Sequence, residues 1–212
     1  MKLLFYFMLI PILLVVSCTG NESKNTPETR KDSFPPKKEN KPSQKTETNS
    51  KKPPIINIVD TVSPKRMIVY IKDSASTFER IRMKLGQIYA FKLPEFFKRN
   101  ELKIMGPPMA WYSTEKAPFF FEAGLPVNKK PAKLTPGLNL RELAADSTVV
   151  AHFYGPYDLL YMGYDALKEW MKDHNKTASG TAYEIYINDP VDKKSKRVDP
   201  YKVQTEIVFP RK

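Results

Sequence analysis

The chain has 212 residues, with 35 lysines and arginines against 23 aspartates and glutamates and a formal net charge of +12 at pH 7. Its single cysteine excludes an internal disulfide bond. The basic residues are scattered, and they cluster only in loops such as 192–197, so a nucleic acid is not an expected partner.

Residues 1–18 have the pattern of a targeting segment. Lys2 precedes an apolar run from Leu3 to Val16, and small residues stand before Cys18. The run is shorter than the roughly 20 residues that a membrane-spanning helix needs. The pattern resembles the bacterial lipobox, which implies cleavage before Cys18 and a lipid on that cysteine. We therefore expect a lipid anchor in the bacterial cell envelope, on the periplasmic side or at the outer membrane. An ordinary secretory signal with an incidental cysteine is the alternative.

Residues 19–54 are predicted to be a disordered tether. The segment is rich in Lys, Pro, Ser, Thr, Asn and Glu, and Phe34 is its only aromatic residue. Such a composition buries too little apolar surface to offset the entropy lost on ordering the chain. The tether would hold the folded part, residues 55–212, away from the membrane as one domain with its own core.

The first half of this domain predicts a strand, a helix and a hairpin. Residues 67–71 form a short apolar run typical of a strand. Ser74 or Ser76 is the expected N-cap of the helix, and Pro94 interrupts its pattern. Residues 109–112 and 119–122 predict a hairpin, and 128–143 a loop that crosses to the second half. The helix is predicted from apolar residues at helical spacing, which are Phe78, Ile81, Leu85, Ile88 and Tyr89.

The second half repeats this order. Residues 148–154 predict a strand, and a turn at Gly155-Pro156-Tyr157 leads into an amphipathic helix that ends near His174. Residues 182–187 and 203–210 predict two strands that pair antiparallel across the polar loop 189–201.

Matching residues indicate that the two halves are a duplication. Four pairs match in order and spacing: Gly106 with Gly180, Tyr112 with Tyr186, Glu122 with Glu206, and Pro126 with Pro210. A period of roughly 75–85 residues is too long for a solenoid repeat. We expect an α+β domain of two βαββ halves related by a pseudo-two-fold, with the helices against one face of antiparallel sheet.

These residues also carry a resemblance to a known family. The run 149–157, the helix that ends near Trp170, the strand through Glu184-Ile185-Tyr186 and the segment 205–210 are similar to the GyrI-like family. This family is the effector-binding domain of some bacterial transcription activators, and the resemblance covers about residues 66–210. It implies two main helices and a central ligand cleft between the halves, as in the haem-binding SOUL proteins. We expect no DNA-binding domain, so a role in transcription is not carried over.

The resemblance implies a site as well. Family members bind lipophilic, often cationic small molecules at a buried glutamate on a late strand inside an aromatic pocket, and by position Glu206 matches that glutamate. Glu122 is its counterpart in the first half. A carboxylate in an apolar strand is expensive to bury unless it meets a cation or stays protonated. The candidate ring faces for a bound cation are Trp111, Tyr112, Tyr157 and Tyr186.

The sequence is compatible with three functions. A membrane-anchored module that binds a small molecule is favoured. Some stand-alone members resemble hydrolases of strained, cyclopropane-type compounds, in which Glu206 would act on water with help from Tyr112, Tyr157 or Tyr186. A structural envelope lipoprotein without a ligand is the third. We expect no cofactor and no metal, because His152 and His174 are far apart in sequence and Cys18 is the only cysteine.

Overall fold

The computed structural model describes residues 52–212 except 115, 193 and 195. The expected signal peptide, the lipidation site Cys18 and nearly all of the expected tether lie outside these residues. In the part that is described, no helix is long and apolar enough to cross a membrane.

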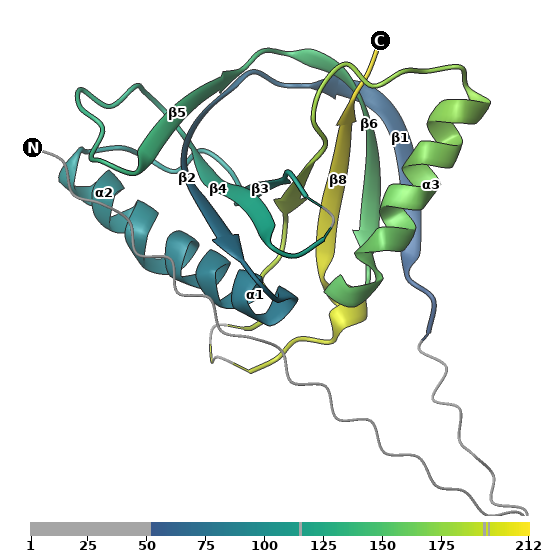
Figure 1. The fold of residues 1–212 in the computed structure, drawn as a ribbon, viewed down its shortest axis with the longest axis horizontal. Coiled ribbons are helices and arrows are strands. Elements are labelled where there is room, and N and C mark those ends of the chain that lie inside the picture. The colour runs from purple at the N-terminus through teal and green to yellow at the C-terminus, as the bar shows by residue number, and fades with distance from the viewer. Residues whose placement is uncertain (1–51, 115, 193, 195) are drawn as a thin grey trace, which may run out of the picture. The chain divides into compact units, whose positions relative to one another are not determined.

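The described residues form a single antiparallel sheet of eight strands with helices on it, in the strand order β1-β6-β8-β7-β3-β4-β2-β5. Figure 1 shows α1 and α2 beside one half of the sheet and α3 beside the other. In chain order the elements are β1 (Ile55–Ser63), β2 (Arg66–Ala75), α1 (Phe78–Gln87), the π-helical η1 (Ile88–Lys92), α2 (Leu93–Arg99), β3 (Met109–Tyr112), β4 (Phe119–Val127), β5 (Leu138–Leu143), β6 (Asp146–Tyr154), the 3-10 turn η2 (Tyr157–Leu159), α3 (Leu160–Asp173), β7 (Tyr183–Tyr186), the 3-10 turn η3 (Pro200–Lys202) and β8 (Gln204–Pro210).

The strand order is symmetric about its central pair, β3 and β7. On either side of that pair stand β4 and then β2 in the first half, and β8 and then β6 in the second. Matching backbone hydrogen bonds accompany this symmetry, because Met105 and Ser179 donate to the carbonyls of Pro126 and Pro210, each at 2.9 Å. The predicted α+β fold of two related βαββ halves is confirmed.

Two edge strands were not predicted. β1 pairs with β6 at one edge of the sheet, and β5 pairs with β2 at the other. The expected loop 128–143 is therefore wrong in its last six residues, which form β5. An edge strand has a neighbour on one side only, and most side chains of β5 are just half-buried. Leu138 and Leu140 alternate with Asn139 and Arg141, but Glu142 breaks the pattern, so the alternation is only four residues long, the lower limit for recognising a strand.

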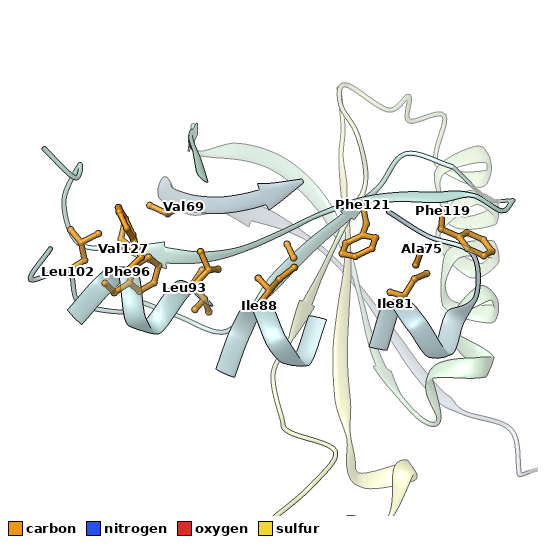
Figure 2. Packing of buried hydrophobic residues seen from close by; sticks show 13 residues of the cluster. Val69, Ala75, Ile81, Ile88, Leu93, Phe96, Leu102, Phe119, Phe121 and Val127 are labelled. Carbon is orange, nitrogen blue, oxygen red and sulfur yellow. The ribbon is translucent and has the colours of Figure 1, made fainter. Parts of the chain in front are cut away.

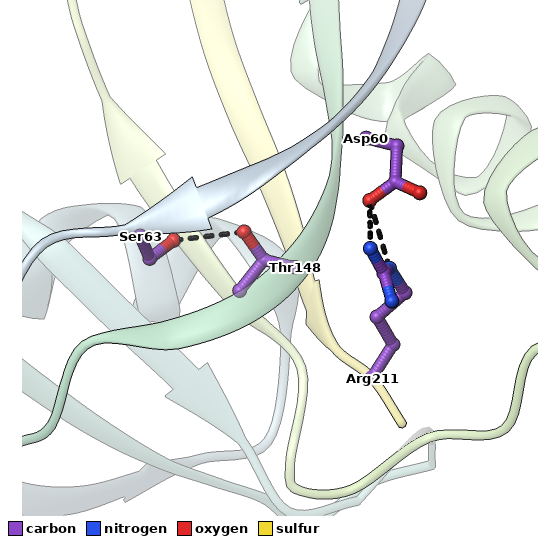
Figure 3. A network of polar contacts seen from close by, with 4 residues as sticks. All are labelled: Asp60, Ser63, Thr148 and Arg211. Carbon is purple, nitrogen blue, oxygen red and sulfur yellow. Dashed lines mark hydrogen bonds and ion pairs between the residues drawn. The ribbon is translucent and has the colours of Figure 1, made fainter.

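Side-chain hydrogen bonds join β1 to residues that are distant in sequence. Figure 3 shows Ser63 beside Thr148 of β6, and Arg211 beside Asp60. Ser63 Oγ lies 3.0 Å from Thr148 Oγ1. Arg211 follows β8 directly, and its Nε donates to Asp60 Oδ1 at 2.8 Å. These contacts join the first described strand to the end of the chain, so β1 belongs to the domain and not to the segment before it.

The first helix continues past the proline that was expected to interrupt it. Pro94 is the second residue of α2 and comes just after η1, so the backbone stays helical on both sides of it although Pro94 has no N–H to donate. The π-helical η1 shifts the helical phase, so Ile88 and Leu93, five residues apart, are both buried. Thr77, rather than Ser74 or Ser76, caps α1 by accepting a 3.2 Å hydrogen bond from the backbone of Arg80.

The helices pack on one face of the sheet. Figure 2 shows Ile81, Ile88 and Leu93 on the same side of their helices as the sheet residues Val69 and Phe121. Under α3 a second apolar cluster forms, and a third lies on the other face of the sheet. All three clusters lie within residues 52–212, so this part of the chain contains a complete core. Fully burying one such side chain contributes about 1.5–3 kcal/mol.

Candidate functional site

One acidic side chain is buried among the described residues. Glu184 of β7 is 5% exposed. Successive side chains of a strand point to opposite faces, so Glu184 and Tyr186 share a face, while Tyr183 and Ile185 point to the other. The neighbouring strands present Ala110 and Ile207 directly opposite Glu184. The carboxylate therefore lies in apolar surroundings at the centre of the sheet.

Tyrosine hydroxyls donate hydrogen bonds to both oxygens of this carboxylate. Tyr164 of α3 donates to Glu184 Oε1 at 2.9 Å, and Tyr186 donates to Oε2 at 2.8 Å. The Tyr186 hydroxyl also lies 2.8 Å from the hydroxyl of Tyr112 on β3. Because the proton of Tyr186 is used on the carboxylate, Tyr112 is the donor in this second bond. The chain Tyr112–Tyr186–Glu184 thus links the two matching tyrosines of the duplication to one carboxylate.

Two further tyrosines complete the surroundings. The rings of Tyr89 in η1 and Tyr157 in η2 have centroids 6.2 and 6.1 Å from that of Tyr186, and Tyr157 meets it edge-on. The Tyr89 hydroxyl donates to the Met109 carbonyl at 2.7 Å. We call the group around Glu184 the tyrosine cage; its members are Tyr89, Tyr112, Tyr157, Tyr164, Tyr186 and Glu184 itself.

Burial dominates the electrostatics of the cage. Burial raises the pKa of the Glu184 carboxyl above 4.5, and the hydrogen bonds from Tyr186 and Tyr164 oppose this shift only in part. Burial, together with the charge of Glu184, raises the pKa of Tyr157 to about 12. The pKa values of the other four tyrosines are also raised, with burial again the main cause. Every hydroxyl of the cage is therefore a protonated donor at neutral pH.

The cage is closed in this structure. The hydroxyls of Tyr164 and Tyr186 contact the carboxylate directly and that of Tyr112 contacts Tyr186, so a ligand must displace these tyrosine side chains to reach Glu184. Two hollows in the described surface lie elsewhere. One of about 540 Å³ is lined by residues between Ile187 and Lys202, and one of about 350 Å³ lies between Phe96 and Lys133. Neither hollow includes a residue of the cage.

Glu206 does not lie in the cage, and its predicted place beside Tyr112 and Tyr186 is wrong. On the β7–β8 ladder it pairs with Ile185, so its side chain points to the face opposite Glu184. There it lies 3.2 Å from Nδ1 of His152 on β6, and its side chain is 22% exposed. Glu206 lies on the strand next to Glu184, but its side chain is on the other face of the sheet.

Glu122 and Trp111 lie on that opposite face too. Glu122 of β4 pairs with Trp111 of β3, and it forms ion pairs with Lys72, at 3.3 Å, and with Arg141. Trp111 is buried between the Arg141 guanidinium, 4.9 Å from its ring, and the ring of Tyr183. Glu122 and Glu206 have matching places in the two halves, since each pairs across its ladder with a basic residue, Lys72 on β2 and His152 on β6. Neither Glu122 nor Trp111 reaches the cage.

The cage thus contains three of the expected residues, namely Tyr112, Tyr157 and Tyr186. Sequence reasoning missed Glu184, Tyr164 and Tyr89. The signal for Glu184 was its position two residues before Tyr186, which puts both on one face of a strand. Tyr164 and Tyr89 lie on the buried sides of their helices, where a tyrosine is not distinguishable by spacing from a core residue.

The fold and the cage define the class of this protein: a duplicated α+β domain in which the described residues place one buried carboxylate beneath the helices. The family model of the GyrI-like small molecule binding domain matches residues 63–212. The chain therefore belongs to the GyrI-like family of small-molecule binding domains, and the resemblance drawn from the sequence is confirmed.

Solved structures with the same fold are distant in sequence. The C-terminal domain of EcmrR is 20% identical, with a TM-score of 0.60 over 74% of this chain and 98% of that one. EcmrR in a complex with DNA gives 20% identity and a TM-score of 0.62, and the match spans only 57% of that longer chain. An uncharacterized conserved protein from Listeria innocua is 14% identical, with a TM-score of 0.50 over 76% of this chain and 92% of that one. No curated protein matches the sequence.

Proposed function

We propose that the domain binds a lipophilic cation in the tyrosine cage, with Glu184 as its counter-ion. The observation that carries this proposal is the burial of the Glu184 carboxylate among tyrosines. An ionised carboxylate is costly in such surroundings unless a cation pairs with it. Among the described residues Glu184 has no ion pair, and its pKa is raised by burial. A cationic ligand would supply the missing charge.

The neighbours of Glu184 favour a ligand with a large apolar surface. Tyrosine rings attract a cation placed over their faces, and this attraction grows when water is excluded. Phe121 and Phe209 extend the aromatic surface, with ring centroids 6.3 and 5.9 Å from Tyr112 and Tyr164. A small, strongly hydrated cation would have to give up its water to enter this aromatic site. A lipophilic organic cation loses little hydration and gains contact with the rings.

We further propose that the domain acts in the cell envelope, held there by a lipid on Cys18. The support is the apolar run before Cys18 and the small residues that precede it. Growth of a bacterial host on a labelled fatty acid tests this. Label should enter the wild-type chain and be absent from Cys18→Ser. Equal labelling of both chains would rule out lipidation at this cysteine.

A thermal-shift titration of residues 52–212 tests the ligand site. The probes are tetraphenylphosphonium and the neutral triphenylphosphine oxide. At a hundredfold excess of ligand over Kd, stabilisation of about 2.7 kcal/mol is expected. Only the cation should stabilise the wild type. Glu184→Gln should abolish the shift, whereas Glu206→Gln should keep it, since Glu206 lies on the opposite face.

The outcomes separate the functions that the sequence left open. A shift that survives Glu184→Gln would exclude Glu184 as the counter-ion. Absence of any shift in the wild type, over a panel of lipophilic cations, would favour a structural envelope protein without a ligand.

One observation favours a second candidate, a hydrolase of strained electrophiles. A carboxyl whose pKa is raised by burial holds its proton nearer to neutral pH, as a general acid requires. The hydrogen-bonded Tyr112–Tyr186 pair leads from this carboxyl toward the other half of the domain. The enzyme candidate requires that Glu184→Gln abolish turnover of a cyclopropane-bearing electrophile while a neutral ligand still binds. If Glu184→Gln lost turnover and ligand binding together, Glu184 would be needed for binding, and a catalytic role would have no support.

A further inference from the structure

The outer side of the first helical segment, Phe78 to Arg99, exposes large apolar side chains. Phe91 is 70% exposed and Met83 56% exposed. With Gln87 they follow one another at four-residue spacing, which places them along one side of the helix. The opposite side is taken up by the core, because Ile81 and Ile88 are buried against the sheet (Figure 2).

The helical segment that carries these side chains is also strongly basic. The segment Phe78 to Arg99 contains six lysines and arginines against two glutamates. Two of the six are paired, Lys84 with Asp73 at 2.5 Å and Arg99 with Glu95 at 3.4 Å. The other four are exposed and have no ion pair within the part of the chain that the structure describes; they are Arg80, Arg82, Lys92 and Lys98.

The matching helix of the second half provides an internal comparison. α3 contains two lysines against three acidic residues, and Lys168 lies 3.8 Å from Asp165. Its only strongly exposed large apolar residue is Tyr161. Both helices cover one face of the same duplicated sheet, so the fold itself does not require the exposed Phe91 and Met83 or the excess of cations. Some other constraint must account for them.

We infer that the exposed surface of this helical segment, which carries Met83, Phe91 and the four unpaired cations, docks on an anionic phospholipid membrane. Exposed aromatic and aliphatic side chains together with lysines and arginines are the side-chain types by which a helix lies in the membrane interface. The apolar residues enter the headgroup region, and the cations meet the lipid phosphates. The ligand cage faces the sheet beneath the helices, so the docking surface is distinct from it.

The length of the preceding chain permits this contact. Residues 19–51 separate Cys18 from the described domain. Fully extended, such a segment spans at most about 120 Å, so a lipid on Cys18 would leave the domain within reach of the membrane. The inference rests on the proposed lipid anchor only for bringing the domain near the membrane. Docking would add a second, reversible signal to the lipid.

The test uses residues 52–212, which lack Cys18 and contain the complete core. Sedimentation compares vesicles of phosphatidylglycerol and phosphatidylcholine in equal parts with vesicles of phosphatidylcholine alone. Binding is expected only with phosphatidylglycerol, and it should weaken as salt is added. Arg80→Gln/Arg82→Gln should lose about fivefold in affinity for each cation removed. Met83→Ser/Phe91→Ser should lose binding to a similar or greater extent.

The matched controls lie on α3. Lys168→Gln/Lys172→Gln and Tyr161→Ser remove side chains of the same types from the equivalent helix and should leave vesicle binding unchanged. All of these residues are exposed, and thermal melts confirm that each variant is folded. Every helix variant should also keep its thermal shift with tetraphenylphosphonium, which separates docking from the function of the cage.

Three results would overturn the inference. Equal binding to vesicles without phosphatidylglycerol would remove the role of the cations, and equal losses in the α3 variants would remove the role of this helix. No binding to either kind of vesicle would exclude a membrane. In that last case, binding to polyglutamate that the Arg80→Gln/Arg82→Gln variant loses would assign the surface to an acidic protein instead.

Discussion

Ala110 and Glu184 face each other across the central β3–β7 pair, at matching positions of the two halves. The spacing that relates Tyr112 to Tyr186 also relates Ala110 to Glu184. The Cβ atoms of directly opposed residues lie about 4.5–5.5 Å apart, so carboxylates at both positions would repel each other strongly. With alanine in one half, the duplicated domain keeps a single carboxylate at its pseudo-two-fold.

The first prediction concerns this asymmetry. Ala110→Glu places a second buried carboxyl beside Glu184, and we expect it to lower the free energy of unfolding by about 3 kcal/mol or more near neutral pH. Denaturant unfolding measures the change. The exchange Ala110→Glu/Glu184→Ala restores a single carboxyl and should recover part of the loss. If Ala110→Glu were as stable as the wild type, the two positions could not lie together in a buried site.

The second prediction is the pH dependence of stability. Burial raises the pKa of Glu184 in the folded state above 4.5, so the folded protein holds that proton more tightly than the unfolded chain does. The resulting stability is fully present below the unfolded value and is lost as pH rises through the raised one. Glu184→Gln, which cannot ionise, should therefore gain stability relative to the wild type as pH rises through this window. Denaturant unfolding over a pH series measures the difference, and a gain that grows toward acid would contradict the assignment.

The third prediction links protons to ligand binding. A cation beside Glu184 favours the ionised carboxylate, so it should displace any proton held there. The affinity for tetraphenylphosphonium should accordingly rise with pH through the raised pKa of Glu184 and then level off. Calorimetry in buffers of different ionisation enthalpy detects the released proton. An affinity that stays constant with pH, with no proton released on binding, would contradict this link between the cation and Glu184.

Much of the fold could be predicted from the sequence, because apolar runs and matching Gly, Tyr, Glu and Pro positions mark the central strands. The site was harder to place. Period-two alternation sorts Glu184 with Tyr186 and Glu206 with Gln204, but it does not say which set the helices cover. Which face is covered depends on how α3, the helix that contains Tyr164, packs on the sheet. The strand pattern also does not tell a buried glutamate from a half-buried one. Glu184 is buried and Glu206 is half-buried, although both stand in apolar strands.

The fourth prediction tests the hydrogen-bonded chain. Tyr186→Phe removes a donor to Glu184 and also the acceptor of Tyr112. A buried polar group left without a partner costs about 1–3 kcal/mol, and a loss of that size is expected on denaturant unfolding. Tyr161→Phe is the matched control, because Tyr161 is 59% exposed. If both variants lost the same stability, the Tyr186 hydroxyl would have no special role.

The fifth prediction concerns the close approach of α3 to the sheet. A Cβ atom on Gly163 would lie 2.5 Å from Ile207 Cδ1 and 3.3 Å from the ring of Phe153, and both residues are fully buried. Gly163→Ala should therefore destabilise the domain by about 1–3 kcal/mol. On α1, a Cβ atom on Gly86 would meet nothing within 4 Å, so Gly86→Ala should instead stabilise by about 0.5–1 kcal/mol.

The two glycine variants also connect packing to the site. Tyr164 follows Gly163 directly, and it reaches Glu184 only because α3 lies close to β8. Displacing α3 lengthens that hydrogen bond, so Gly163→Ala should weaken the thermal shift with tetraphenylphosphonium as well as the fold. Gly86→Ala should leave the shift intact. If Gly163→Ala reduced stability and left cation binding unchanged, the Tyr164–Glu184 contact would not be needed for the ligand.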